Sequence, residues 1–179
     1  MSDELEDQMV AKTEELTEEK KGGDAVAEAT ELAQIDPKDA IVWFVKGKAH
    51  YIDNQFDEAL SSFSKAAELD KENPQIWHMM GYALISLNRY SEAEEALTYV
   101  KAMQPANAEA LCALGICQVL AGKPDDAKLN FNTAISMDKP ISMLMLEHFH
   151  DKFFAVSKDT PSRTKAMIER ILETLKLVR

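Results

Sequence analysis

The fold of this chain is decided by three consecutive segments of 34 residues: AIVWFVKGKAHYIDNQFDEALSSFSKAAELDKEN (40–73), PQIWHMMGYALISLNRYSEAEEALTYVKAMQPAN (74–107) and AEALCALGICQVLAGKPDDAKLNFNTAISMDKPI (108–141). Four positions carry similar side chains in all three segments: a large apolar residue, a glycine, an alanine and a second large apolar residue. They are Trp43, Trp77 and Leu111; Gly47, Gly81 and Gly115; Ala59, Ala93 and Ala127; and Phe63, Leu97 and Phe131. Such a fixed period is typical of a solenoid built from helix pairs.

Each segment is predicted to form two helices joined by a short turn. In the first segment, Trp43, Gly47 and His50 follow the i, i+4, i+7 spacing of one helical face. Residues that favour turns over helix then follow at Asp53-Asn54-Gln55, Asn88-Arg89 and Gly122-Lys123-Pro124. Glycine in the first helix and alanine early in the second let two backbones approach, and the large apolar residues fill the remaining space.

With these residues in place, the sequence resembles the tetratricopeptide repeat family, whose pattern has Trp at position 4, Gly at 8 and Ala at 20 of each repeat. The departures are modest. An example is position 11, a Tyr in the family, which is His50, Leu84 and Gln118 here. The resemblance implies an all-α fold, a right-handed α-solenoid of helix-turn-helix repeats. The repeats are expected at 40–73, 74–107 and 108–141.

The two ends of the chain follow the repeat less closely. Ala25, Ala29, Leu32 and Pro37 are in phase with it, which predicts a leading half repeat at 24–39. Residues 1–23 are rich in acids, and both a frayed helix and disorder are open for them.

The C-terminal region, 142–179, is expected to supply capping helices. Residues 142–156 are too apolar for an exposed helix and should pack on the third repeat. Thr160, an N-cap before Pro161, predicts a second helix at 161–178.

Composition excludes several classes of function. The 179 residues carry a formal net charge of −11, which argues against nucleic acid as a partner because phosphate binding needs clustered Lys and Arg. The first residues lack the apolar core of a signal peptide, and no stretch has the roughly 20 apolar residues of a membrane span. The two cysteines form no disulfide framework, which suits a reducing compartment. We therefore expect a soluble, cytoplasmic protein that does not engage a membrane.

No set of residues predicts catalysis, a metal or a cofactor. His148 and His150 lie in the sequence EHFHD but are two residues apart, so they point to different sides of a helix and cannot ligate one metal together. Cys112 has no evident base beside it. Phosphate-binding loops and nucleophile elbows are missing from the sequence. The chain is therefore expected not to be an enzyme.

The residues that vary between repeats predict a binding surface instead. If positions 4, 8 and 11 face the paired helix, positions 2, 5, 6, 9 and 13 lie on the opposite side. In the family that the sequence resembles, this side lines a concave groove that receives peptides. The predicted peptide-binding groove contains Phe44, Val45, Lys48, His78, Met79, Tyr82, Glu109, Cys112 and Ile116, with Tyr51 flanking them at position 12.

This groove is unusually apolar. Family members that hold acidic chaperone tails use Lys, Asn and Arg at five groove positions, where this sequence has Phe44, Lys48, Met79, Glu109 and Ala113. Only Lys48 keeps a positive charge, so binding of such tails is not expected.

An apolar groove is usually covered, because large exposed apolar patches mark binding sites or cause aggregation. A peptide or amphipathic helix of a partner protein is the favoured occupant, which makes the chain a protein-binding scaffold or adaptor. Its own last helix and a second copy, as a homodimer, are alternatives, and a chaperone-like holder of an apolar client is another.

Overall fold

The computed structural model describes residues 2–19, 21–154, 166 and 169–170. These residues form helices and no strand, which confirms the all-α helical repeat fold. The helices are α1 (Ser2–Glu18), α2 (Gly22–Ile35), α3 (Ala40–Ile52), α4 (Phe56–Leu69), α5 (Pro74–Ser86), α6 (Tyr90–Met103), α7 (Ala108–Leu120), α8 (Pro124–Met137) and α9 (Lys139–Phe154). The helix expected at 161–178 falls, apart from three positions, outside the described residues, and so does its cap Thr160.

The chain divides into two compact units, unit 1 (residues 1–96) and unit 2 (residues 97–179). The division falls within α6. Unit 1 thus holds α1 to α5 with the first turns of α6, and unit 2 holds the last turns of α6 with α7 to α9.

The first helix of each full repeat begins at a capping residue with the 34-residue period. Asp39 and Asn73 accept hydrogen bonds from the backbone N–H groups of Ile41 and Gln75, at 2.7 and 3.0 Å. Asn107 accepts one from the N–H of Ala110 at 2.9 Å. Since the first N–H groups of a helix have no partner within it, these side chains set where α3, α5 and α7 begin.

The turn inside each repeat carries the same period. Asn54, Asn88 and Gly122 have φ angles of 60°, 59° and 76°, the left-handed region that Asn and Gly tolerate best. The N–H of the residue after each of them bonds back to a carbonyl in the last turn of the preceding helix, as in Gln55 N–H to His50 O at 2.9 Å. The chain therefore reverses at the positions that the sequence predicts.

Within the repeats, glycine and phenylalanine pack directly on each other. A Cβ built on Gly47 would collide with the ring of Phe63, and one built on Gly115 would lie 2.5 Å from Cε1 of Phe131. Both phenylalanines are fully buried. The close approach expected from the sequence is thus a contact between the glycine of one helix and the aromatic ring of its partner.

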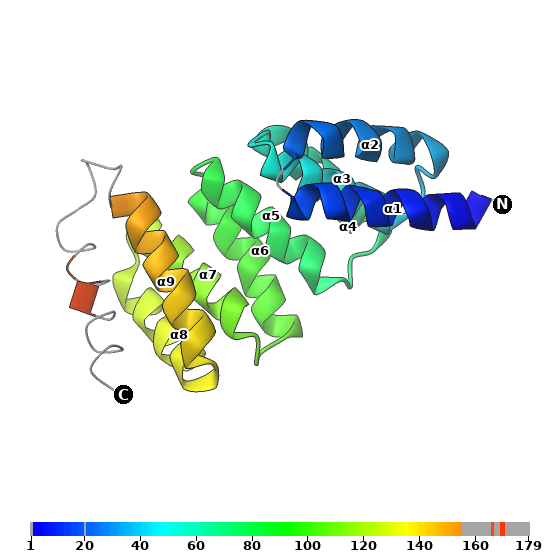
Figure 1. The fold of residues 1–179 in the computed structure, drawn as a ribbon. Helices are drawn as coiled ribbons and strands as arrows, with labels where there is room; N and C mark the ends of the chain where they lie inside the picture. The colour runs from blue at the N-terminus through cyan, green and yellow to red at the C-terminus, as the bar shows by residue number, and fades with distance from the viewer. Residues whose placement is uncertain (1, 20, 155–165, 167–168, 171–179) are drawn as a thin grey trace. The chain divides into compact units, whose positions relative to one another are not determined.

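The N-terminal residues of unit 1 form a helix pair. Helix α1 packs on α2 and α3, and Figure 1 shows α1 and α2 side by side. Met9 is buried with Leu32 and Val42, and buried Thr13 hydrogen-bonds to the carbonyl of Met9 at 2.8 Å. Residues 2–18, for which the sequence leaves a frayed helix and disorder open, are helical, and this helix packs through side chains such as Met9 and Thr13.

In unit 2, α9 lies along α7 and α8 (Figure 1). Leu146 is fully buried and Phe149 is 9% exposed in a cluster with Ile116 and Phe131. Leu144, at 67% exposed, lies on the outer side of α9. Helix α9 therefore covers an apolar face that α7 and α8 would otherwise leave open.

Candidate functional site

The predicted groove residues fall on three helices, and each unit has its own share. In unit 1 they lie on α3 (Phe44, Val45, Lys48, Tyr51) and α5 (His78, Met79, Tyr82). In unit 2 they lie on α7 (Glu109, Cys112, Ile116). The structure gives the two groups different surroundings.

The unit 2 residues are largely covered. Cys112 is fully buried and packs in a cluster with Ile141 and Met145 of α9, and Ile116 is 8% exposed beside Leu146. Glu109 is half-buried. Cys112 and Ile116, which the sequence predicts to line the groove, are therefore covered, because they pack against side chains of α9.

Burial also sets the chemistry of Cys112. Removal from water raises the pKa of its thiol, a hydrogen bond with Ser142 works in the opposite direction, and the charge of Glu109 raises the pKa further. A thiol in these surroundings stays protonated and is a poor nucleophile.

In unit 1, three helices surround a hollow of about 190 Å³. It is lined by Thr17 and Glu18 of α1, by Lys48, Tyr51 and Ile52 of α3, and by Met79 of α5. Three predicted groove residues, Lys48, Tyr51 and Met79, thus share one site. We call it the unit 1 hollow.

The remaining unit 1 residues of the predicted groove do not line the hollow. Phe44 is half-buried and tilts against Phe63, with ring centroids 5.9 Å apart. His78 and Tyr82 are also half-buried, and their ring centroids lie 4.7 Å apart. Val45 is 1% exposed. This residue, also predicted for the groove, is buried because α3 packs against helices on several sides, α1 among them.

The charge of Lys48 is engaged within the protein. Its Nζ donates a hydrogen bond to Oε1 of Glu14 at 3.1 Å and lies 5.8 Å from the ring centroid of Phe44. The ion pair is partly exposed, with 29% of the Lys48 side chain and 46% of the Glu14 side chain accessible. An acidic ligand would have to compete with Glu14 for this ammonium group.

The sequence pattern did not predict that residues of α1 line the hollow. Glu14, Thr17 and Glu18 lie 34 residues before Lys48, Tyr51 and Ile52. The repeat period, carried one step further towards the N-terminus, would have found them. That period is hard to recognise in α1 because Met9 and Thr13 stand where the repeat pattern has the Trp and Gly of Trp43 and Gly47.

The described residues were also compared with the requirements of a metal site and of a membrane span. They contain no group of three or more His, Cys, Asp or Glu side chains arranged to hold a metal ion. In the same part of the chain, no helix combines the length and the apolar character needed to cross a bilayer.

Comparison with known families agrees with this geometry. A family model described as tetratricopeptide repeat matches residues 21–74 and 78–139, and a second model of the same description matches residues 50–100. The chain belongs to the tetratricopeptide repeat family. Repeats of this family generally act as non-enzymatic modules for protein–protein interaction, and this chain has the fold of such a module. No curated protein matches the sequence.

Several solved structures share the fold. MamA 41-end from Desulfovibrio magneticus RS-1 is 20% identical with a TM-score of 0.74, over 97% of this chain and 96% of that one. YrrB, a TPR protein with an unusual peptide-binding site, is 19% identical with a TM-score of 0.66, over 94% and 88%. The first TPR of Spaghetti (RPAP3), bound to the HSP90 peptide SRMEEVD, is 16% identical with a TM-score of 0.57, over 79% and 94%. At these identities the likeness establishes the fold alone.

Proposed function

We propose that the chain binds a segment of a partner protein at unit 1, with one apolar side chain of that segment seated in the unit 1 hollow. The observation that carries the proposal is the hollow itself, where Tyr51, Ile52 and Met79 present apolar surface between three helices. Ile52 is 37% exposed, so a ligand can reach it.

The size of the hollow favours a peptide side chain over a free small molecule. Sites for drug-sized ligands measure roughly 300–1,000 Å³, and this one has about 190 Å³. Burying one large apolar side chain contributes about 1.5–3 kcal/mol. The rest of the affinity would come from half-buried side chains on two of the helices that line the hollow, Phe44 on α3 and His78 and Tyr82 on α5. Such side chains suit a peptide backbone lying across α3 and α5.

Selection from a phage-displayed library of random peptides on the full-length protein tests this function. Peptides selected on the wild type should bind Ile52→Glu about tenfold or more weakly, because the substitution places a charge in the hollow. Ile35→Glu is the matched control, since Ile35 is 41% exposed on α2 and does not line the hollow. Peptides that bind Ile52→Glu as well as the wild type, or a selection that yields none, would contradict the proposal.

Three further measurements distinguish the other possible occupants. A homodimer that uses the hollow should dissociate in Ile52→Glu, as seen by sedimentation equilibrium. If residues 160–179 fill the hollow, their deletion should raise peptide affinity. A chaperone-like holder should suppress aggregation of an unfolded client without selecting any peptide sequence.

A further inference from the structure

The charges at the unit 1 hollow are unbalanced. Of its lining residues, Glu18 and Lys48 are charged, and Lys48 is paired with Glu14. The three groups together carry two negative charges and one positive charge. Glu18 lies in the last turn of α1, lines the hollow and is exposed, so a ligand that enters from solvent can reach its carboxylate.

The surrounding unit has the same sign. Residues 1–96 contain 22 acidic and nine basic side chains, a net charge of −13, whereas residues 97–179 contain nine acidic and eleven basic side chains, a net charge of +2. The net negative charge of the protein therefore comes from the unit that holds the hollow. A field of this sign attracts cations and repels acidic ligands over about a Debye length, roughly 10 Å at 0.1 M salt.

The apolar and charged parts of the site are next to each other. Thr17 and Glu18 of α1 form one wall, and Tyr51, Ile52 and Met79 form the apolar surface. A ligand that inserts an apolar side chain therefore places its neighbouring residues beside the Glu18 carboxylate. Complementary charge at such a position governs which partners are accepted and how fast they associate.

From this arrangement we infer that the occupant of the hollow is a positively charged segment, in which an apolar side chain enters the hollow and a nearby Lys or Arg pairs with Glu18. This inference rests on the proposed function and adds the chemical class of the partner. The expected ligand therefore differs from the acidic peptide SRMEEVD bound to the first TPR of Spaghetti (RPAP3). In this protein the lysine of the hollow, Lys48, already donates a hydrogen bond to Glu14.

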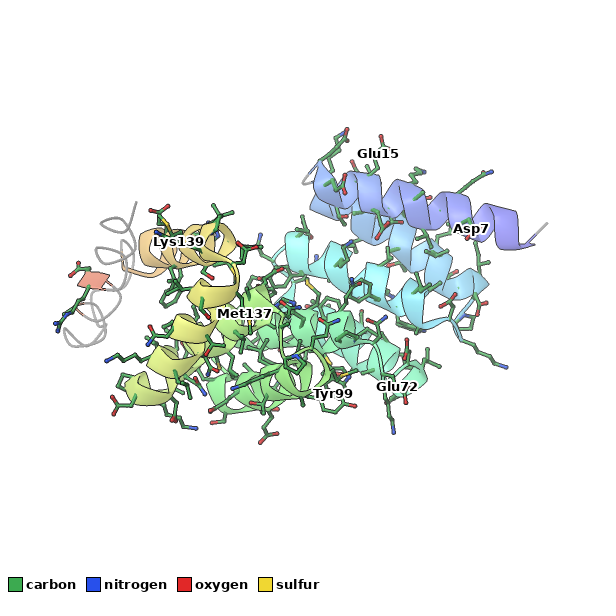
Figure 2. All side chains as sticks on the ribbon, turned by 90° about the horizontal axis from the view of Figure 1, so that it is seen from below. Asp7, Glu15, Glu72, Tyr99, Met137 and Lys139 are labelled. Carbon is green, nitrogen blue, oxygen red and sulfur yellow. The ribbon has the colours of Figure 1, made fainter. Side chains whose placement is uncertain are left out.

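The test uses the peptides selected on the wild-type protein and compares three proteins by fluorescence polarisation. Glu18→Lys reverses the charge at the hollow and should weaken a selected basic peptide about tenfold at low salt. Glu15→Lys is the matched control: it makes the same charge change on the same helix, and Figure 2 shows Glu15 on the side of α1 turned away from α2 and α3. The control should weaken binding about twofold or less.

Two further readouts support or overturn the charge assignment. Selected peptides should carry a net positive charge, and their affinity should fall as salt is raised from about 0.02 M to about 0.5 M, because screening shortens the Debye length. Peptides that need Ile52 but are neutral or acidic, or that respond equally to Glu18→Lys and Glu15→Lys, would overturn this inference and leave the proposed function standing. A selection without any Ile52-dependent peptide would instead remove the proposed function.

Discussion

Replacing Gly115 by alanine tests how closely the helices of a repeat approach. A Cβ at this position would lie 2.5, 2.7 and 2.9 Å from Cε1, Cδ1 and Cζ of Phe131. Ordinary carbon contacts are about 3.5–4.0 Å, so the overlap is about 1 Å. Phe131 is fully buried among residues such as Val119 and Leu146, so a shift of its ring has to displace packed neighbours.

Two effects of opposite sign determine the outcome of Gly115→Ala. Overpacking a core costs about 1–3 kcal/mol, and the overlap places this site in the upper part of that range. Alanine in a helix interior recovers about 0.8–1.0 kcal/mol relative to glycine. We expect the free energy of unfolding to fall by about 1–2 kcal/mol, measured by urea denaturation followed by far-UV circular dichroism.

Two further variants, a control at Gly23 and a rescue at Phe131, test whether the close approach causes the loss of stability. Gly23, near the start of α2, has no heavy atom within 4 Å of a built Cβ, so Gly23→Ala should be neutral or raise stability by about 0.5 kcal/mol. Phe131→Leu should relieve the overlap, so the double variant with Gly115→Ala should show a favourable coupling of about 1 kcal/mol. If Gly115→Ala were as stable as the wild type, the argument from close approach would be wrong.

Three other predictions follow from single contacts. Asn73→Ala should lower the free energy of unfolding by about 1 kcal/mol in the same urea assay, because it removes the cap of α5; Asn73→Asp, which can still accept from the Gln75 N–H, should keep most of that stability. The acidic peptide SRMEEVD should not bind measurably in isothermal titration calorimetry, because Glu14 holds Lys48; micromolar binding that is lost in Lys48→Ala would contradict this. Cys112 should react slowly with a thiol reagent at mildly alkaline pH, where an exposed cysteine begins to ionise, because burial raises its thiol pKa; rapid reaction of this residue in the folded protein, located by peptide mapping, would show that α9 does not cover it.

Local signals predicted the fold in detail because they act over a few residues. The turns at Asn54, Asn88 and Gly122 need a residue that tolerates positive φ, and such residues are recognisable in a sequence. The small residue at Gly47 predicted a close approach of two helices, and the structure shows that the ring of Phe63 is what approaches it. These features repeat with a fixed period, so each occurrence supports the others.

The candidate site was predicted only in part, because exposure depends on segments that do not follow the repeat pattern. Cys112 and Ile116 lie on the expected face of α7, but α9 covers that face. Val45 lies on the expected face of α3 and is buried as well. Lys48, Tyr51 and Met79 were predicted and share one hollow.

By itself, then, the sequence determined that the chain is a helical repeat, where its helices turn, and that one side of its repeats is apolar. It could do so because capping, turn formation and the packing of small against large residues are local properties. Only the tertiary structure decided which part of the apolar side stays open and what charge lies beside it. That outcome depends on how α1 and α9 pack on their neighbours, and burial and ion pairing such as that of Lys48 with Glu14 arise only when distant segments meet.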